Sequence, residues 1–95
     1  MVLGYGKITF KLHDCHSLKE KRKIVKSIVS KTKNRFNASV AEVALNDIHD
    51  RAQIGFSMTG NDRRKMDSGI DGLMRFVESI GLAEIIGEET EILNI

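Results

Sequence analysis

The order of two hydrophobic periodicities constrains the fold of this chain most strongly. In four stretches apolar residues alternate with polar ones or lie among β-prone residues. In two other stretches apolar residues recur every three to four residues. Alternation predicts a half-buried strand, and the 3.6-residue spacing predicts a helix with one buried face. The predicted strands cover about 2–13, 38–45, 52–59 and 82–93, and the predicted helices cover about 18–36 and 63–80.

Polar residues and glycines mark the boundaries of both helices. Ser17 and Glu20 form the S-x-x-E pattern of a capping box, which predicts the start of the first helix. The run Gly-Asn-Asp at 60–62 offers an N-cap for the second helix, and Gly81 predicts its end. The segment 46–50, Asn-Asp-Ile-His-Asp, predicts a turn between the second and third strands.

The resulting order is strand, helix, strand, strand, helix, strand. Two right-handed crossovers then give a four-stranded antiparallel sheet with both helices on one face, the ferredoxin-like α+β fold. Ninety-five residues fit a single domain over 1–95, with the first and third strands in the centre. Four glutamates in the last strand suit an exposed edge, where charge prevents pairing with other sheets.

Composition indicates a small globular domain of the cytoplasm. The chain is 41% hydrophobic and 29% charged, and it has no proline. Its single cysteine, Cys15, has no partner for an internal disulfide, which fits a reducing compartment. No stretch resembles a signal peptide or approaches the length of a membrane span, so we expect no insertion into a membrane.

Charge is divided unequally along the chain. Residues 17–36 hold eight basic residues against one acidic residue, a net charge of +7, whereas the rest carries −5. Cations at the start of a helix oppose the helix dipole, and like charges three or four residues apart repel each other. The charges of this helix therefore oppose its own stability, and residues that oppose the local structure are expected at functional sites.

The simplest partner for this helix is a polyanion, because neutralised phosphates release counterions. We therefore predict contacts to structured RNA or the ribosome through a set of seven basic residues. They are Lys19, Lys21, Arg22, Lys23, Lys26, Lys33 and Arg35. Two alternatives stay open: a merely solvated helix face, and a surface for an acidic protein or a membrane.

Lys21 differs from the other cations because the helical spacing puts it on the core side, near Leu18, Val25 and Ile28. A lysine there either extends its ammonium to solvent along the apolar surface or points into a pocket. We consider an anion pocket shared by Lys21 and Arg51.

The remaining reactive side chains do not form a recognisable site. The segment His13-Asp14-Cys15-His16 and the separate His49 lack the ligand spacing of a zinc site. No third group orients a nucleophilic Cys15, so we predict no catalytic residue, metal or cofactor. Phe10 and Phe56 follow the core register, which leaves Tyr5 alone on the open sheet face and argues against base stacking there.

Five segments carry a resemblance to a known family. They are Ser-Leu-Lys-Glu-Lys-Arg at 17–22, Asn-Arg-Phe-Asn at 34–37, Val-Ala-Glu-Val at 40–43, and the pairs 51–52 and 61–62. With these, the chain resembles the YlxP-like bacterial family of unknown function over essentially its whole length. The resemblance implies a ferredoxin-like domain in the bacterial cytoplasm, with genes often near those for translation initiation and ribosome maturation. The loop 44–52 departs from the family pattern, and the family brings no catalytic residues.

The leading hypothesis is a non-enzymatic module that binds RNA or the ribosome through its basic first helix. The alternative is a dimeric ferredoxin-like sensor of small molecules or a protein-interaction module, with its site at a subunit interface. A homodimer would cover the open sheet face, which we expect to be lined by Tyr5, Lys7, Thr9, Lys11, Gln53 and Ser57.

Overall fold

The structure, a computed structural model, describes all 95 residues and has the predicted order of elements. The elements are β1 (Val2–Lys11), α1 (Leu18–Arg35), β2 (Ser39–Ala44), β3 (Arg51–Gly60), α2 (Arg63–Ile80) and β4 (Glu84–Asn94). β1 ends at Lys11, two residues before the predicted end at His13. Asp14, which has a φ of 57°, turns the chain toward α1.

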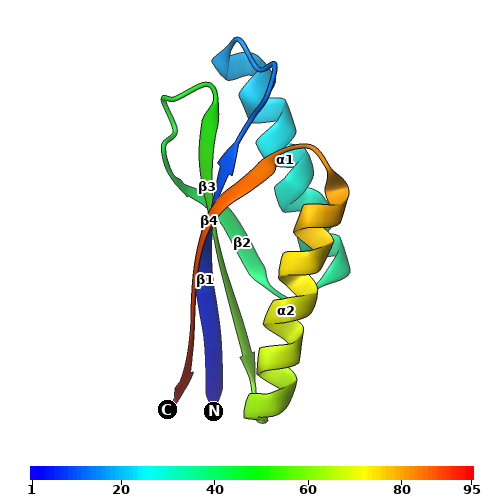
Figure 1. Cartoon of the computed structure of the whole chain (residues 1–95). Helices are drawn as coiled ribbons and strands as arrows, with labels where there is room; N and C mark the ends of the chain where they lie inside the picture. Colours follow the sequence, from blue (N-terminus) through cyan, green and yellow to red (C-terminus); the bar gives the residue numbers. More distant parts are fainter.

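The four strands form one antiparallel sheet in the order β2-β3-β1-β4, which confirms the ferredoxin-like prediction. Figure 1 shows both helices on the same side of the sheet and the two chain ends side by side. The ends are joined by two hydrogen bonds between Met1 and Ile95. The other face of the sheet is therefore open. Neither helix has the length and apolar character needed to cross a membrane.

A single core lies between the sheet and the helices. It contains fifteen buried apolar residues, and the most enclosed of them come from β1, β3 and α2: Ile8, Phe10, Ala52, Ile54 and Leu73. The helical spacing of apolar residues in 63–80 is confirmed: Met66, Ile70, Leu73 and Val77 are buried, and Ile80 is partly buried against the core. In α1 four residues are also buried, but only Val25 and Ile28 are apolar; the other two are Lys21 and Thr32.

Two glycines of β1 allow close approaches that a side chain would block. A Cβ atom on Gly4 would lie 2.5 Å from Met66 Sδ, and one on Gly6 would lie 2.5 Å from the Glu89 carbonyl oxygen. These glycines let α2 and β4 pack closely against the central strand. The sheet has two β-bulges, neither at these glycines: β4 inserts Ile86 opposite Thr9 and Phe10, and β2 inserts Val43 between Glu42 and Ala44.

β4 is an exposed edge strand, as predicted, and its charges suit that position. Glu88 lies opposite Ile8 in the register, so it points toward the helix side of the sheet even though it is exposed. An inward-pointing charge and a bulge on an edge strand both discourage another strand from pairing with it. Four glutamates on one strand therefore have a structural explanation.

Hydrogen bonds cap both helices at the predicted residues. The Ser17 hydroxyl accepts from the Glu20 amide at 3.1 Å, and the Asp62 carboxylate accepts from the Lys65 amide at 3.1 Å. Gly81 ends α2 with a φ of 72°, a left-handed conformation that glycine adopts without strain. The Glu20 carboxylate accepts from the His16 amide, one residue before the position that a standard capping box uses.

Replacing the N-cap should destabilise the protein measurably. Ser17→Ala removes the acceptor for the Glu20 amide and should lower the free energy of unfolding by about 1 kcal/mol. Ser30→Ala is the matched control, because Ser30 is an exposed residue in the interior of α1, where alanine is the better helix former. Urea unfolding of both variants checks this. Equal stabilities would contradict the placement of the cap.

Candidate nucleic-acid interface

Five exposed cations share the outer face of α1, and we call them the ridge: Lys19, Arg22, Lys23, Lys26 and Lys33. At about 100° per residue they point away from the buried positions Val25 and Ile28. None of them lies within 4.0 Å of a carboxylate, since the four ion pairs of the protein involve other residues. The ridge is therefore a strip of positive charge without internal neutralisation.

The one acidic residue of α1 does not offset the ridge. Glu20 is placed to pair with Lys23 one turn later, but its carboxylate accepts a hydrogen bond from the His16 amide at 3.1 Å. It thus serves the helix start, where a negative charge favours the dipole. The repulsion among the ridge cations stays uncompensated in the free protein.

Lys21 is not part of the exposed charge, which corrects its prediction as a nucleic-acid ligand. Its side chain is 1% exposed, among the most enclosed in the protein. The ammonium donates a hydrogen bond to the Leu45 carbonyl and lies 3.1 Å from Glu42 Oε2. A cation with this burial cannot reach a phosphate while the fold is intact, and it does not extend to solvent either.

The proposed anion pocket of Lys21 and Arg51 is likewise not formed. The Arg51 guanidinium lies 3.4 Å from the Asp50 carboxylate and donates to the Asp50 carbonyl at 3.1 Å. Lys21 instead contacts Glu42. Each cation already has its own carboxylate, so no pair of free positive charges is left for a bound anion.

The contact between Lys21 and Glu42 is coulombic in character. Glu42 Oε2 is buried but receives no hydrogen bond of normal geometry, although the Lys21 ammonium is close. Leu45, whose carbonyl completes the site, has a φ of 62°, which is unusual for a residue with a branched side chain. We conclude that Lys21 joins α1 to β2 and holds the following loop in a strained turn.

The cysteine and histidines do not converge on a reactive centre. Cys15 is buried in the core, and its thiol donates to the Ser17 carbonyl at 3.6 Å. His13 contacts the Glu84 carboxylate at 2.7 Å, which ties the β1–α1 loop to β4. No group of three or more His, Cys, Asp or Glu side chains is arranged to hold a metal ion.

Arg35 occupies a different place from the ridge. Its guanidinium carbon lies 5.9 Å from the centre of the Phe76 ring of α2. Arg75, also on α2, lines the same open groove, of about 410 Å³. Sequence reasoning missed Arg75, although the spacing of Gly72, Phe76 and Ser79 around it marks one flank of α2.

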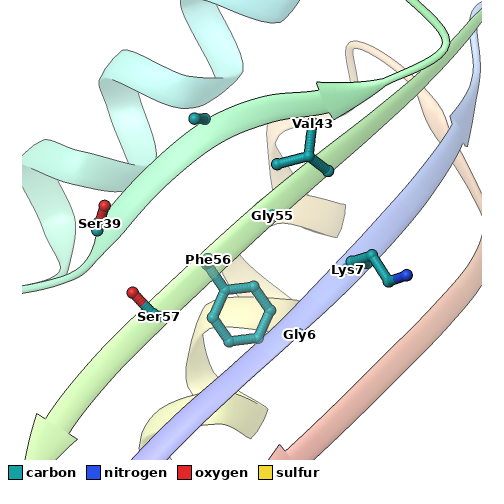
Figure 2. A pocket seen from close by; sticks show the side chains of 8 residues that line it. Gly6, Lys7, Ser39, Val43, Gly55, Phe56 and Ser57 are labelled. Atoms are coloured by element: carbon teal, nitrogen blue, oxygen red, sulfur yellow. The ribbon is translucent and has the colours of Figure 1, made fainter.

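The open sheet face has a shallow groove of about 330 Å³ over β2, β3 and β1. Figure 2 shows the side chains of Ser39, Val43, Lys7 and Ser57 around the part of the sheet surface that Gly55, which has no side chain, leaves uncovered. A Cβ atom on Gly55 would lie 2.8 Å from Val43 Cγ1, so the glycine is needed beside this valine. The predicted isolation of Tyr5 is confirmed, because Phe10 and Phe56 are buried.

Comparison with known proteins agrees with this architecture. Residues 3–90 match a family described as a protein of unknown function, DUF503. The chain belongs to the DUF503 family. It is 27% identical over 78 residues to the uncharacterized protein YlxP of Bacillus subtilis, covering 82% of this chain and 85% of that protein. The expected relation to YlxP-like proteins is thus confirmed, and it carries no assigned activity.

Solved structures show the same fold at low sequence identity. The protein YJCS superposes with a TM-score of 0.61 at 14% identity, over 97% of this chain and 99% of its own. The Arabidopsis thaliana protein At3g17210 has a TM-score of 0.52 at 11% identity, covering 98% and 94%. The de novo designed protein Foldit4 has 0.51 at 12% identity, covering 99% and 97%. These likenesses concern the fold alone.

Breaking the buried ion pair should be costly. Lys21→Met leaves the Glu42 carboxylate and the Leu45 carbonyl without their cation, and it should lower the free energy of unfolding by about 3 kcal/mol. Adding Glu42→Gln removes the uncompensated charge and should recover part of this loss. A double-mutant cycle by denaturant unfolding should give a coupling energy of about 1 kcal/mol or more. Strictly additive losses would show that the two side chains do not interact.

The single tyrosine gives a pH-dependent readout of the open face. The Tyr5 hydroxyl donates to Glu91 Oε2 at 2.6 Å, and this bond, with smaller effects from desolvation and the Glu91 charge, raises the pKa of Tyr5 above 10.0. Its stabilising effect is present below the unfolded-state pKa and disappears as pH rises through the folded-state pKa.

In Glu91→Ala the tyrosinate absorbance should appear at a lower pH than in the wild type. Glu88→Ala is the control, since that carboxylate lies on the helix side of the sheet. Identical titration midpoints for wild type and Glu91→Ala would contradict the hydrogen bond.

Proposed function

We propose that this protein is a non-enzymatic module that binds structured RNA, such as that of the ribosome, by phosphate contacts of the ridge. The single observation that carries the proposal is the ridge itself: five exposed cations on one helix face, none within 4.0 Å of a carboxylate. Cations in this state keep their full charge available for phosphates.

The cost of this arrangement to the free protein supports a binding role. Lys19, Arg22 and Lys23 lie in the first turns of α1, where the helix dipole disfavours cations. Lys26 follows Arg22 and Lys23 at the spacings that bring like charges together. Glu20 does not reduce this repulsion by pairing with a lysine, because its carboxylate accepts from the His16 amide just before the helix. A solvated surface has no need of this strip, whereas a polyanion would be attracted to it.

The geometry of the ridge favours phosphates over base edges as the contacted groups. The ridge side chains are lysines and one arginine, with no exposed aromatic residue among them. Tyr5, the aromatic residue of the open sheet face, is engaged with Glu91. Contacts of this kind recognise the charge and shape of a duplex and carry little sequence information.

A second candidate is a small-molecule sensor or protein-interaction module, and the groove over Gly55 favours it. The exposed side chain of Val43 rises beside this groove, and a partner or a second copy of the chain could cover both. In this case the ridge would be a solvated surface, and the affinity for RNA would be no higher than expected for any protein of the same net charge.

Reversing two ridge charges separates the candidates. Lys19→Glu with Lys23→Glu puts acids into the first turns of α1 and should raise the free energy of unfolding by about 0.5–1.5 kcal/mol at low salt. The same variant should bind a fully paired RNA hairpin more weakly. Its plot of log affinity against log salt should be shallower by about 1 for each lysine removed.

The control is Lys7→Glu with Lys11→Glu, which changes the net charge equally on the open sheet face. Fluorescence anisotropy across a salt series measures both variants and the wild type. A ridge variant and a control with the same affinity and the same salt slope would remove the physical support for the RNA proposal.

A further inference from the structure

A second cationic feature lies between the helices. The end of α1 and the C-terminal half of α2 border an open surface groove of about 410 Å³. Figure 1 shows the end of α1 beside α2. The groove is lined by Arg35, Phe36, Gly72, Arg75, Phe76 and Ser79.

The charge of this groove is unbalanced. Arg35 and Arg75 are exposed, and neither lies within 4.0 Å of a carboxylate. On α2, Asp67 lies on the far side, while Asp71 and Glu78 lie about one turn before and after Arg75, on the side of it turned away from Phe76. Both guanidiniums, which match the oxygens of a phosphate in a bidentate fashion, line the same groove, and neither forms an ion pair with a carboxylate.

The floor of the groove is aromatic. The rings of Phe36 and Phe76 meet edge to face, with centroids 5.6 Å apart and an angle of 68° between their planes. Both side chains are only half-buried, and the Arg35 guanidinium lies over the Phe76 ring at 5.9 Å. Aromatic rings and guanidinium planes are the surfaces on which proteins stack unpaired bases.

The packing of α2 against Phe36 does not require a glycine at position 72. A Cβ atom there would lie 3.7 Å from Phe36 Cε1, an ordinary contact, so a side chain would fit. Glycine inside a helix is less favourable than alanine. A larger residue at this position would, however, cover the ring edge and fill the groove.

We infer that this groove binds one unpaired nucleotide of an RNA strand. Its phosphate contacts Arg35 and Arg75, and its base lies over Gly72 against the two phenylalanine rings. This inference rests on the proposed function and adds a preference to it: the ridge contacts paired RNA, while the groove selects RNA that exposes a base.

The groove is tested first without RNA. Adenosine monophosphate should shift the amide NMR signals of Gly72 and Phe76, with a dissociation constant about tenfold below those of adenosine and of inorganic phosphate, because phosphate and base contacts combine. Gly72→Leu should abolish the effect. Gly69→Leu is the matched control, since a Cβ there has nothing within 4 Å. Equal binding of the three probes, or none, would overturn the inference.

RNA hairpins with and without one bulged nucleotide then separate this inference from the proposed function. The wild type should prefer the bulged hairpin about tenfold. Arg75→Gln and Gly72→Leu should lose the preference and keep most of the affinity for the paired hairpin, whereas Arg64→Gln on the same helix should keep both. The ridge variant should bind both hairpins more weakly and retain the preference for the bulged one.

A preference that survives Arg75→Gln and Gly72→Leu, or is absent in the wild type, would overturn the inference that the groove binds a nucleotide. Failure of the wild type to bind either hairpin would overturn the proposed function, and the mononucleotide result would then decide the groove alone.

Discussion

The buried ammonium of Lys21 is the interaction on which the arrangement of α1 depends. It lies in the core, 3.1 Å from Glu42 Oε2 on β2, and donates to the carbonyl of Leu45. Removing a charge from water is costly unless a partner compensates it, so the helix has one favourable position against β2. With α1 held there, the ridge points away from the sheet and the end of the helix reaches Phe76 of α2.

The charges of α1 therefore divide into two kinds with different consequences. Lys21 is neutralised inside the protein and contributes to the fold, whereas the ridge is not neutralised and weakens the helix start. Arg35 belongs to neither, because it lies against an aromatic ring beside Arg75. The helix layer as a whole presents cations, while the open sheet face carries paired charges such as Lys7 with Glu89.

Periodicity was sufficient for the fold but not for the site. The alternation of Ile8 and Phe10, the cap at Ser17 and the stop at Gly81 are local features, and the structure confirms all three. The angle of Lys21 on the helix placed it on the core side, but its partner, Glu42, lies on another element. A pairing between elements depends on packing that local patterns do not encode, which is why the pocket with Arg51 was wrong and Arg75 was missed.

A map of where RNA contacts the protein tests the role of the ridge most directly. We would titrate the isotopically labelled protein with a fully paired RNA hairpin and follow its amide NMR signals. If the ridge binds phosphates, shifts should concentrate along the exposed face of α1 and decline with added salt, while β1 and β3 remain unaffected. Shifts concentrated around Tyr5 and Gly55 on the open sheet face, with α1 unaffected, would contradict this role of the ridge.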